Sequence, residues 1–414
     1  MRADGAPGVA HAARRIRVAH VVPGMFGQLF GGHARYLYSL LSGWRDQDIV
    51  LDLWGTDTKP VNMNSGTRDY RLPEGKSLWS DGRVPSRLGL LQGAARLLAT
   101  LVSRRNEFDI VHLHALWWGE LLSPTVLHRV GKRVVFTTSL YGSDNPGTIA
   151  QNRGALGLNL YRQFDGVVAL SPALAEDCAD HGISNVLCLP NFLVIPELET
   201  GRNDGLRAAM RARHRIPPED TVLLFNGTAI RRKGLDILVE SYIRVAKAHQ
   251  RAWLVLLGPC SKAEAGPGFD LSYLDEQRRR LHEAHLSGRV IWTGMVTDKR
   301  ELVGYYSAAD VFVLPTRAEG MPNVLAEAAA AGLPVVSTNL PGCTDYAILN
   351  GETGFLVPPE DVGAFTHAVE RILSDPALAA RMSRSARVRS RLFDFDSYCS
   401  RLRDFYVGTM ESSS

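Results

Sequence analysis

The chain has 414 residues, of which 45% are hydrophobic and 22% are charged, and its formal net charge is +4. This length exceeds one ordinary hydrophobic core, so about two or three domains of a soluble globular protein are expected. A net charge this small argues against nucleic acid as a partner, and it permits a phosphate ligand or weak attraction to anionic lipid. The five cysteines are scattered and odd in number, which favours a reducing compartment.

The start of the chain, MRADGAPGVAHAARR, has no long apolar run, so residues 1–15 are expected to be a disordered tail rather than a secretory signal. Leu88–Val102 is the most apolar long stretch, but it is too short, and with Arg96 too charged, to span a membrane. The wider segment Arg83–Arg105 mixes Leu and Arg at near-helical spacing. This pattern suits an ordinary surface helix and a helix on an anionic membrane equally well. We therefore expect a cytoplasmic protein, either free or peripheral at the inner face of the membrane.

Residues 16–195 alternate between short apolar runs and amphipathic segments. The runs predict buried strands, and the segments between them predict helices such as Gly32–Ser42 and Pro172–His181. This βα rhythm predicts a parallel sheet covered by helices. The predicted strands are Arg17–Val22, Ile49–Trp54, Ile110–His114, Val134–Thr138, Val167–Leu170 and Val186–Leu189.

The rhythm pauses at residues 190–204, PNFLVIPELETGRND, which have no clear period and predict a linker. It resumes over residues 205–385, so we predict an α/β protein with two doubly wound domains that face each other across a cleft. Residues 386–414 predict a last helix, capped by Asp394 or Asp396. The strands predicted in the second domain are Val222–Phe225, Trp253–Leu257, Arg289–Trp292, Val311–Leu314, Val335–Ser337 and Phe355–Val357.

Two loops that follow predicted strands carry residue types that bind phosphate. The first, PGMFGQLFGGHARYL, includes Gly31 and Gly32 and precedes a helix. Glycines let a backbone approach an anion, but a plain surface loop explains them equally well, and the dinucleotide-binding fingerprint is missing. The second loop, NGTAIRRKG, brings Arg231, Arg232 and Lys233 in front of a helix. Its position after a strand favours a pyrophosphate over a solvated run of charges.

The stretch PTRAEGMPNVLAEAAAAGLPVV holds two glutamates, Glu319 and Glu327, after the predicted strand Val311–Leu314. Glu319 falls in the loop and Glu327 in the predicted helix Asn323–Ala331. Carboxylates accept hydrogen bonds from pairs of hydroxyls, as ribose and hexose offer, and a helix N-terminus favours phosphate. A sugar nucleotide would satisfy all of these groups. For any two glutamates taken alone, however, a turn residue and a solvent-exposed side chain are the better explanation.

EGMPNVLAEAAAAGLPVVST resembles the E-x7-E signature of the retaining family 4 glycosyltransferases, and the resemblance covers most of the chain. It implies the GT-B fold, in which an N-terminal acceptor-binding domain (residues 16–195) faces a C-terminal donor-binding domain (residues 205–385). It also implies that the last helix, within residues 386–414, packs back on the N-terminal domain. The other matching fragments, in chain order, are GGHARYL, FDIVHLH, FDGVVALSPALAEDCADHGISNVLCLPN, KGLDILVESY, VIWTGMV and NGETGFLVPPED.

The resemblance also implies which residues bind the donor. Glu327 would bind the ribose hydroxyls, Lys233 the diphosphate, and Glu319 the donor sugar. The other donor-binding positions that it implies are Gly31, Gly32, Arg231, Val296, Gly320, Met321, Pro322, Asn323 and Val324.

Two positions depart from the pattern of the family. Thr228 stands where the family often has an arginine, and Arg231 or Arg232 would supply the missing charge from a shifted position. Tyr141, in SLYGSD, stands where many members have a histidine. Tyrosine still donates a hydrogen bond but carries no positive charge, and Asp144 nearby is a candidate polar contact to donor or acceptor.

The acceptor is expected against the N-terminal domain. His114 matches a family histidine in a loop on the acceptor side. Phe26 and Trp117 lie near the ends of predicted strands, where aromatic rings stack on a sugar or line a lipid or polyketide site, although a place in the core explains each equally well. Together with Tyr141 and Asp144, Phe26 and Trp117 make up the predicted acceptor site.

No metal or other cofactor is expected. His112 and His114 alternate along a predicted strand and are expected to face opposite sides of it, which makes them a poor pair for a shared metal. The sequences DQD (residues 46–48) and DFD (residues 394–396) are short matches that turn and cap residues explain better than a metal site.

The predicted reaction moves a hexose from a UDP- or GDP-sugar to a hydroxyl of a glycan, lipid-linked or small-molecule acceptor, with retention at the anomeric carbon. Negative charge develops on the leaving diphosphate, and preorganised cations and amides must stabilise it. The residues predicted at the reaction centre are therefore Lys233, Arg232, Glu319 and His114. Two alternatives stay open: a non-catalytic paralogue that binds a nucleotide sugar, which the two departures motivate, and a nucleotide-sugar epimerase.

Overall fold

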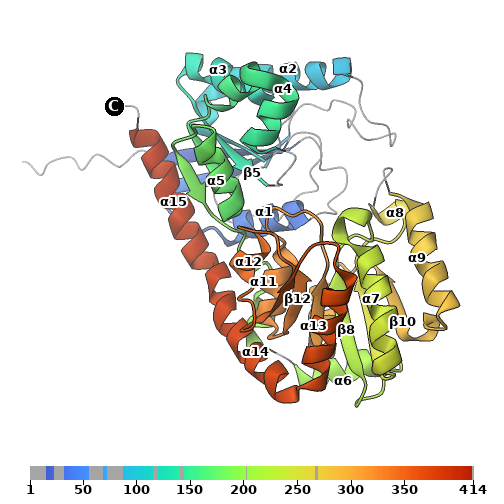
Figure 1. Ribbon diagram of the computed structural model, residues 1–414. Coiled ribbons are helices and arrows are strands. Elements are labelled where there is room, and N and C mark those ends of the chain that lie inside the picture. Colours follow the sequence, from blue (N-terminus) through green and yellow to red (C-terminus); the bar gives the residue numbers. More distant parts are fainter. Residues whose placement is uncertain are drawn as a thin grey trace, which may run out of the picture.

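The computed structural model describes residues 15–22, 32–55, 69–71, 87–114, 120–139, 144–201, 203–265 and 269–412. Over these residues the strands form two parallel sheets flanked by helices, and the two sheets lie in separate halves of the molecule (Figure 1). The prediction of two doubly wound α/β units is therefore confirmed. The ends of the predicted strands differ from the observed ends by at most two residues.

The first sheet has seven strands within the described ranges, in the order β3-β2-β1-β4-β5-β6-β7. Its central strands are covered on both faces, so they are near-continuous apolar runs; Val134, Val135 and Phe136, for example, are fully buried. The strands are β1 (Ile16–Val22), β2 (Ile49–Gly55), β3 (Asp69–Arg71), β4 (Ile110–Leu113), β5 (Arg133–Thr138), β6 (Gly166–Ala169) and β7 (Val186–Cys188).

The second sheet has six strands in the described part of the chain, in the order β10-β9-β8-β11-β12-β13. They are β8 (Thr221–Asn226), β9 (Ala252–Leu257), β10 (Val290–Gly294), β11 (Val311–Leu314), β12 (Val335–Thr338) and β13 (Gly354–Val357).

Helices connect the strands in both halves of the molecule. Those of the first half are α1 (Gly32–Gly43), α2 (Arg87–Ser103), α3 (Ser123–Leu127), α4 (Pro146–Tyr161) and α5 (Pro172–Asp180). Those after β7 are α6 (Asp204–Arg213), α7 (Leu235–Ala248), α8 (Lys262–Ala265), α9 (Leu271–Glu283), α10 (Lys299–Ala308), α11 (Asn323–Ala330), α12 (Thr344–Ala347), α13 (Val362–Ser374), α14 (Pro376–Arg389) and α15 (Phe395–Glu411).

Each sheet has a point where the strand order reverses, between β1 and β4 in the first and between β8 and β11 in the second. Open parallel sheets bind ligands outside the carboxyl ends of the strands at such a point. In the second sheet, the chain after β8 enters a 3-10 helix at Arg231–Lys233, and the loop after β11 spans residues 315–322. The two segments touch, because the backbone N–H of Arg317 donates to the carbonyl of Arg232 at 2.8 Å.

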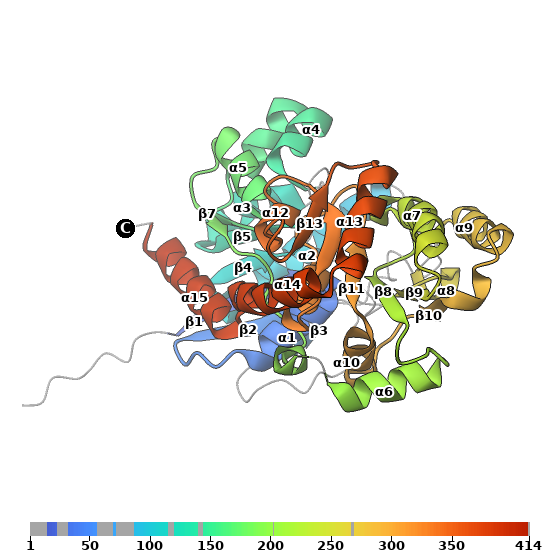
Figure 2. The same ribbon diagram turned by 60° about the horizontal axis from the view of Figure 1, so that its bottom comes forward.

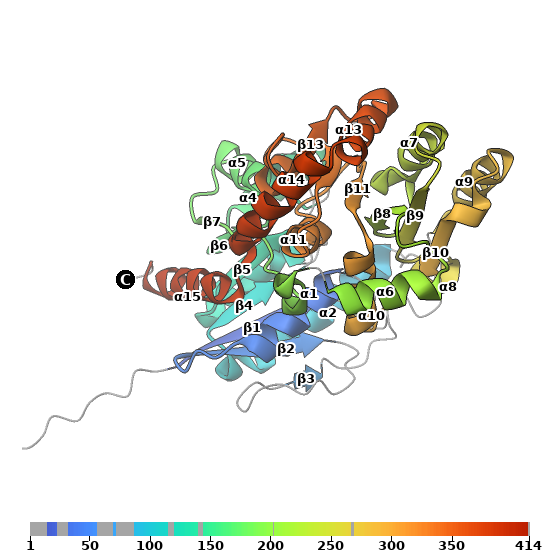
Figure 3. The ribbon, with the colours of Figure 1, turned by 90° about the horizontal axis from the view of Figure 1, so that it is seen from below.

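The last helix, α15, packs back on the first sheet, as predicted. It runs beside the strands of that sheet in two further views (Figure 2, Figure 3). Asp394 caps it by accepting from the N–H of Ser397 at 2.7 Å. Farther along, Tyr406 is fully buried, and its hydroxyl lies 2.6 Å from Nδ1 of His112 on β4. The carboxyl end of the chain therefore fastens onto the amino-terminal half.

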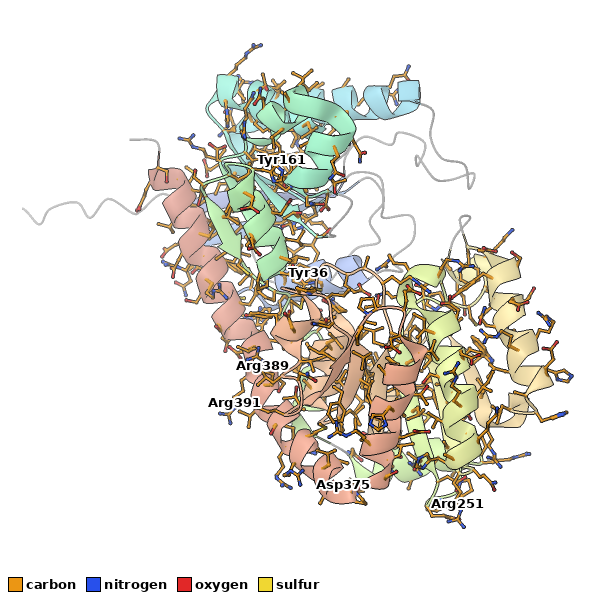
Figure 4. The ribbon with its side chains drawn as sticks, in the orientation of Figure 1. Tyr36, Tyr161, Arg251, Asp375, Arg389 and Arg391 are labelled. Carbon is orange, nitrogen blue, oxygen red and sulfur yellow. The ribbon has the colours of Figure 1, made fainter. Side chains whose placement is uncertain are left out.

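The two halves also meet directly. Tyr36 on α1 lies at their junction (Figure 4) and bonds to the hydroxyl of Tyr398 on α15. Asn191 donates to the side-chain oxygen of Asn323 on α11 at 2.8 Å, and Ala173 N–H donates to Gly342 O at 3.0 Å. Much of the segment predicted as a linker, residues 190–204, is buried in this region.

Two findings bear on the expected cellular setting. No helix in the described ranges has both the length and the apolar composition needed to cross a membrane. All five cysteines are free thiols. The amphipathic segment around residue 90 does form a helix, α2, which is consistent with both interpretations of that segment given above.

Candidate active site

A pocket of about 1310 Å³ lies between the two halves of the molecule. Its walls come from the loops that follow β8, β9, β10 and β11, from the start of α11, and from the start of α15. The first half contributes residues of α1 and the ends of β5 and β6. The predicted donor-site residues that line this pocket are Arg232, Lys233, Val296, Glu319, Gly320, Met321, Pro322, Asn323, Val324 and Glu327.

Glu319 and Lys233 form the centre of the pocket's charge. Glu319 lies in the loop after β11 and is only 8% exposed. Its Oε1 accepts from Lys233 Nζ at 2.5 Å and from Thr316 Oγ1 at 2.9 Å, and its Oε2 lies 3.2 Å from Arg232 Nη1. Two cations thus surround one carboxylate. The group as a whole is positive and suits an anionic ligand.

Lys233 reaches this position because of the turn that follows it. Gly234 has φ +72° and ψ 29°, a left-handed conformation that ends the 3-10 helix Arg231–Lys233 and starts α7. A Cβ at Gly234 would lie 1.8 Å from the carbonyl oxygen of Pro315, so only glycine fits here. The backbone of the basic segment is therefore pressed against the loop that carries Glu319.

Glu327 lies on α11, with its side chain buried at the pocket wall. Its Oε2 accepts from the hydroxyl of Tyr306 at 2.6 Å and from Nδ2 of Asn226 at 3.4 Å. Asn226 also donates to the Tyr306 hydroxyl at 3.1 Å. Tyr306 and Asn226 were not anticipated from the sequence. Both fix the carboxylate above the carboxyl end of β8.

The start of α11 forms another wall. Pro322 is the N-cap, and Asn323 and Val324 open the helix, so the first backbone N–H groups of α11 lie at the pocket. A helix N-terminus carries partial positive charge and favours a phosphate. This wall adds to the positive field of Lys233 and Arg232.

Glu264 joins the loops that follow β9 and β10, and no pattern in the sequence marked it. Its carboxylate accepts from the N–H of Cys260 at 3.0 Å, the hydroxyl of Ser261 at 3.2 Å, and the N–H of Met295 at 3.1 Å. The backbone N–H of Cys260 stabilises the ionised carboxylate, which lowers the pKa of Glu264. Glu264 thus ties the chain after β9 to the chain after β10, where Val296 lines the pocket.

The structure separates the two neighbouring arginines. Arg232 lines the pocket and donates to Ala318 O at 2.7 Å. Arg231 has a side chain that is 71% exposed, stacks over the ring of Tyr273 at 4.8 Å, and lies 3.7 Å from Asp236. It does not line the pocket. Arg232, together with Thr228 on the same wall, therefore occupies the region for which either arginine had been a candidate.

The predicted acceptor-side residues are placed only in part. Phe26, Gly31, Trp117 and Tyr141 lie outside the described residues, and Gly32 is the first residue of α1. Asp144 is buried, and its carboxylate accepts from Thr138 Oγ1 at 2.9 Å, Ser139 N–H at 3.1 Å and Ser139 Oγ at 3.0 Å. These bonds fix the backbone at the end of β5, so Asp144 stabilises the fold at this point.

His114 follows β4, is 5% exposed, and is not part of the lining of the pocket. The expectation that His112 and His114 face opposite sides is wrong. Their rings stack with centroids 4.4 Å apart. Side chains two positions apart on a strand point to the same face, so the alternation along β4 brings them together. His20 on β1 joins them, and the nitrogen atoms of the three residues lie within 4.8 Å of one another.

Comparisons with known proteins agree with this arrangement. The family model described as Glycosyl transferase 4-like domain matches residues 31–191, and the family model described as Glycosyl transferases group 1 matches residues 207–389. A D-inositol 3-phosphate glycosyltransferase of Streptomyces avermitilis is 30% identical over 321 residues, which cover 75% of this chain and 67% of the relative. A glycogen synthase of Mycobacterium tuberculosis is 28% identical over 385 residues, which cover 88% and 87%.

Among solved structures, the fold resembles Anabaena Alr3699/HepE, crystallised in complex with UDP-glucose. The TM-score is 0.71 at 17% identity, and the match covers 95% of this chain and all of the other. At this identity the likeness concerns the fold alone.

Proposed function

Because the chain belongs to the group 1 glycosyltransferases, we propose that it binds a nucleoside-diphosphate sugar, with UDP- and GDP-sugars as candidates, and transfers the hexose to a hydroxyl group. One observation carries this proposal. Two cations, Lys233 and Arg232, lie beside the buried Glu319, and the buried Glu327 lines the same pocket at the switch point of the second sheet. A nucleoside-diphosphate sugar has a negatively charged diphosphate between two hydroxyl-bearing rings. The two cations would match the diphosphate, and the two carboxylates would match the hydroxyls of the rings.

The diphosphate would lie against Lys233, Arg232 and the start of α11. Lys233 is now paired with Glu319 at 2.5 Å, and a phosphate would share this cation. Bond cleavage at the anomeric carbon adds negative charge to the leaving diphosphate, and preorganised donors in a partly enclosed site stabilise that charge. Fixed cations and amides would supply this stabilisation in place of a metal ion. Retention of the sugar's configuration is proposed from the resemblance to the retaining family 4 enzymes.

The remaining groups fit the two ends of the donor. Glu327 would accept from the ribose hydroxyls, because an ionised carboxylate is an acceptor with about four lone-pair sites. The base would lie near Val296, in the loop that Glu264 holds. Glu319 would accept from hydroxyls of the donor hexose.

The acceptor is proposed to enter from the first half of the molecule, whose residues line the opposite wall. Two relatives are named for D-inositol 3-phosphate and for glycogen, both of which carry hydroxyl groups. These names support a hydroxyl acceptor such as a glycan, a lipid-linked glycan or a small polyol.

Thermal unfolding in the presence of UDP, GDP, ADP and dTDP tests the donor class. A nucleotide present at a hundredfold its dissociation constant is expected to add ~2.7 kcal/mol to the free energy of unfolding. One base should stabilise the protein more than the others. No stabilisation by any of the four would contradict a nucleotide-sugar site.

Once the preferred base is known, incubating the protein with sugar donors of that base separates three functions. Slow hydrolysis of the donor supports a transferase, isomerisation of the sugar indicates an epimerase, and no turnover indicates a non-catalytic paralogue.

Replacing Glu327 with alanine is expected to weaken nucleotide affinity about tenfold to a hundredfold. A hydrogen bond to a charged group contributes about 1.5–3 kcal/mol, and the ribose would lose its acceptor. Titration calorimetry with the preferred nucleotide measures the effect. Tyr306→Phe is the matched control. It removes the hydroxyl that donates a hydrogen bond to Glu327 but keeps the carboxylate that would bind the ribose. Equal affinity of Glu327→Ala and the wild type would remove the ribose assignment.

A further inference from the structure

Five buried polar side chains form a chain of hydrogen bonds beneath the carboxyl end of the first sheet. Thr137 Oγ1 on β5 lies 2.6 Å from His112 Nε2, and His112 Nδ1 lies 2.6 Å from the Tyr406 hydroxyl. The same hydroxyl lies 3.3 Å from His20 Nε2, and His20 Nδ1 lies 2.8 Å from His114 Nε2. The chain of bonds therefore runs from β5 to the residue that follows β4, at the switch point of this sheet.

The final helix supplies the middle of this chain. His20 and His112 are register partners on the adjacent strands β1 and β4. Tyr406 comes from α15 and places one hydroxyl between their rings. All five side chains are at most 5% exposed. Without the docked helix, the two histidines would lose the group that joins them.

The chemistry of the links makes them depend on one another. A neutral imidazole donates from one nitrogen and accepts at the other. If Thr137 donates to His112, then His112 donates to Tyr406, Tyr406 to His20, and His20 to His114; the reverse direction is equally consistent. Burial lowers the pKa of His20 to about 3, because the charged ring would lose its hydration, so this ring stays neutral and links two neighbours.

We propose that Tyr406 is a positioning residue that fixes the tautomer and ring orientation of His114 through His20. The second nitrogen of a neutral imidazole is an acceptor in one tautomer and a donor in the other, so the tautomer sets the chemistry of that nitrogen. That this serves sugar transfer rests on the proposed function, whereas the hydrogen-bonded chain itself does not.

The spacing of the nitrogens favours hydrogen bonds over a shared metal ion. Two nitrogens on a tetrahedral ion with bonds of about 2.0–2.1 Å are separated by about 3.3 Å. The His20 and His114 nitrogens are 2.8 Å apart, which is a hydrogen-bond distance. Both ring nitrogens of His112 also contact hydroxyl groups. A metal would therefore have to open links that are already closed.

Side-chain nitrogen NMR of the full chain, labelled with 15N-histidine, tests the proposal at neutral pH. Signals are assigned with single His20→Gln and His114→Gln variants. We expect one dominant tautomer for His20 and for His114 in the wild type, and a mixture of both tautomers in Tyr406→Phe. Tyr398→Phe removes another buried tyrosine hydroxyl from the same helix, one that bonds to Tyr36 instead, and should leave the tautomers unchanged.

Unchanged histidine tautomers in Tyr406→Phe, or stoichiometric zinc binding that shifts all three histidines in the wild type, would overturn the proposal. If Tyr406→Phe does not fold, Thr137→Val takes its place, because it removes the hydroxyl at the other end of the series of hydrogen bonds. If the wild type transfers no sugar at all, the proposed function fails. The NMR result still shows whether Tyr406 fixes the tautomer of His114.

Discussion

Replacing Lys233 with alanine is expected to lower turnover about 100-fold to 1000-fold at saturating donor. Loss of one preorganised contact to a developing negative charge raises a barrier by ~2.7–4 kcal/mol. Lys233 lies in the pocket with its Nζ 2.5 Å from Glu319 Oε1, and the proposed function has this cation meet the leaving diphosphate. The measurement is the rate of nucleotide release from the donor that the thermal screen selects.

Arg231→Ala is the matched control for this variant. Arg231 belongs to the same 3-10 helix as Lys233 and carries the same charge, but its side chain is exposed and stacks on Tyr273 outside the pocket. We expect its turnover to be close to that of the wild type. Equal losses in the two variants would mean that general positive charge, rather than a local contact, is responsible. Wild-type turnover in Lys233→Ala would remove the proposed role.

The strands were predictable because both sheets are parallel and covered on both sides. Such strands appear in the sequence as short continuous apolar runs, and Val311–Leu314 is found with its bounds unchanged. Among the strands of the described residues, the one missed was β3, Asp69–Arg71. It is three residues long, lies at the edge of its sheet, and has charged residues at both ends, so no apolar run marks it.

The place of the pocket's charged residues at one edge of the second sheet was predictable for a related reason, whereas their roles were implied only by the resemblance to a known family. Lys233 and Glu319 lie in loops that follow strands, and the carboxyl ends of parallel strands share one edge of a sheet. Tyr306, Asn226 and Glu264 were missed because each acts through a contact between distant segments. Tyr306, for example, is 21 residues before Glu327, on a different helix, and no local pattern shows that the two will meet.

The histidines show how a correct pattern led to a wrong geometry. The alternation of His112 and His114 was visible in the sequence, but it was assigned to opposite faces of the strand. Their partner His20 is 92 residues before His112, and only the pairing of β1 with β4 brings it near. Tyr406 is more distant still, and its position depends on α15 returning to the first sheet.

Gly234→Ala is expected to lower the free energy of unfolding by ~3 kcal/mol or more and to abolish measurable nucleotide binding. Left-handed backbone costs a residue with a Cβ about 1–2 kcal/mol. Here the Cβ would also meet the Pro315 carbonyl at 1.8 Å, so the loop that carries Glu319 must move away from Lys233. A single methyl group thus disturbs the stability of the fold and the charge pair of the site together. Chemical denaturation and calorimetry measure the two effects.

Gly131→Ala separates the cost of a left-handed backbone from the cost of the close contact with Pro315. Gly131 follows the 3-10 helix His128–Val130 with φ 71° and ψ 31°, nearly the same angles as Gly234, but a Cβ there would have nothing within 4 Å. This variant should therefore lose only the ~1–2 kcal/mol that left-handed backbone costs and should bind nucleotide normally. If both variants lose the same stability, the contact with Pro315 does not constrain the loop. Lys233 and Glu319 would then be placed by something other than the packing of these two backbones.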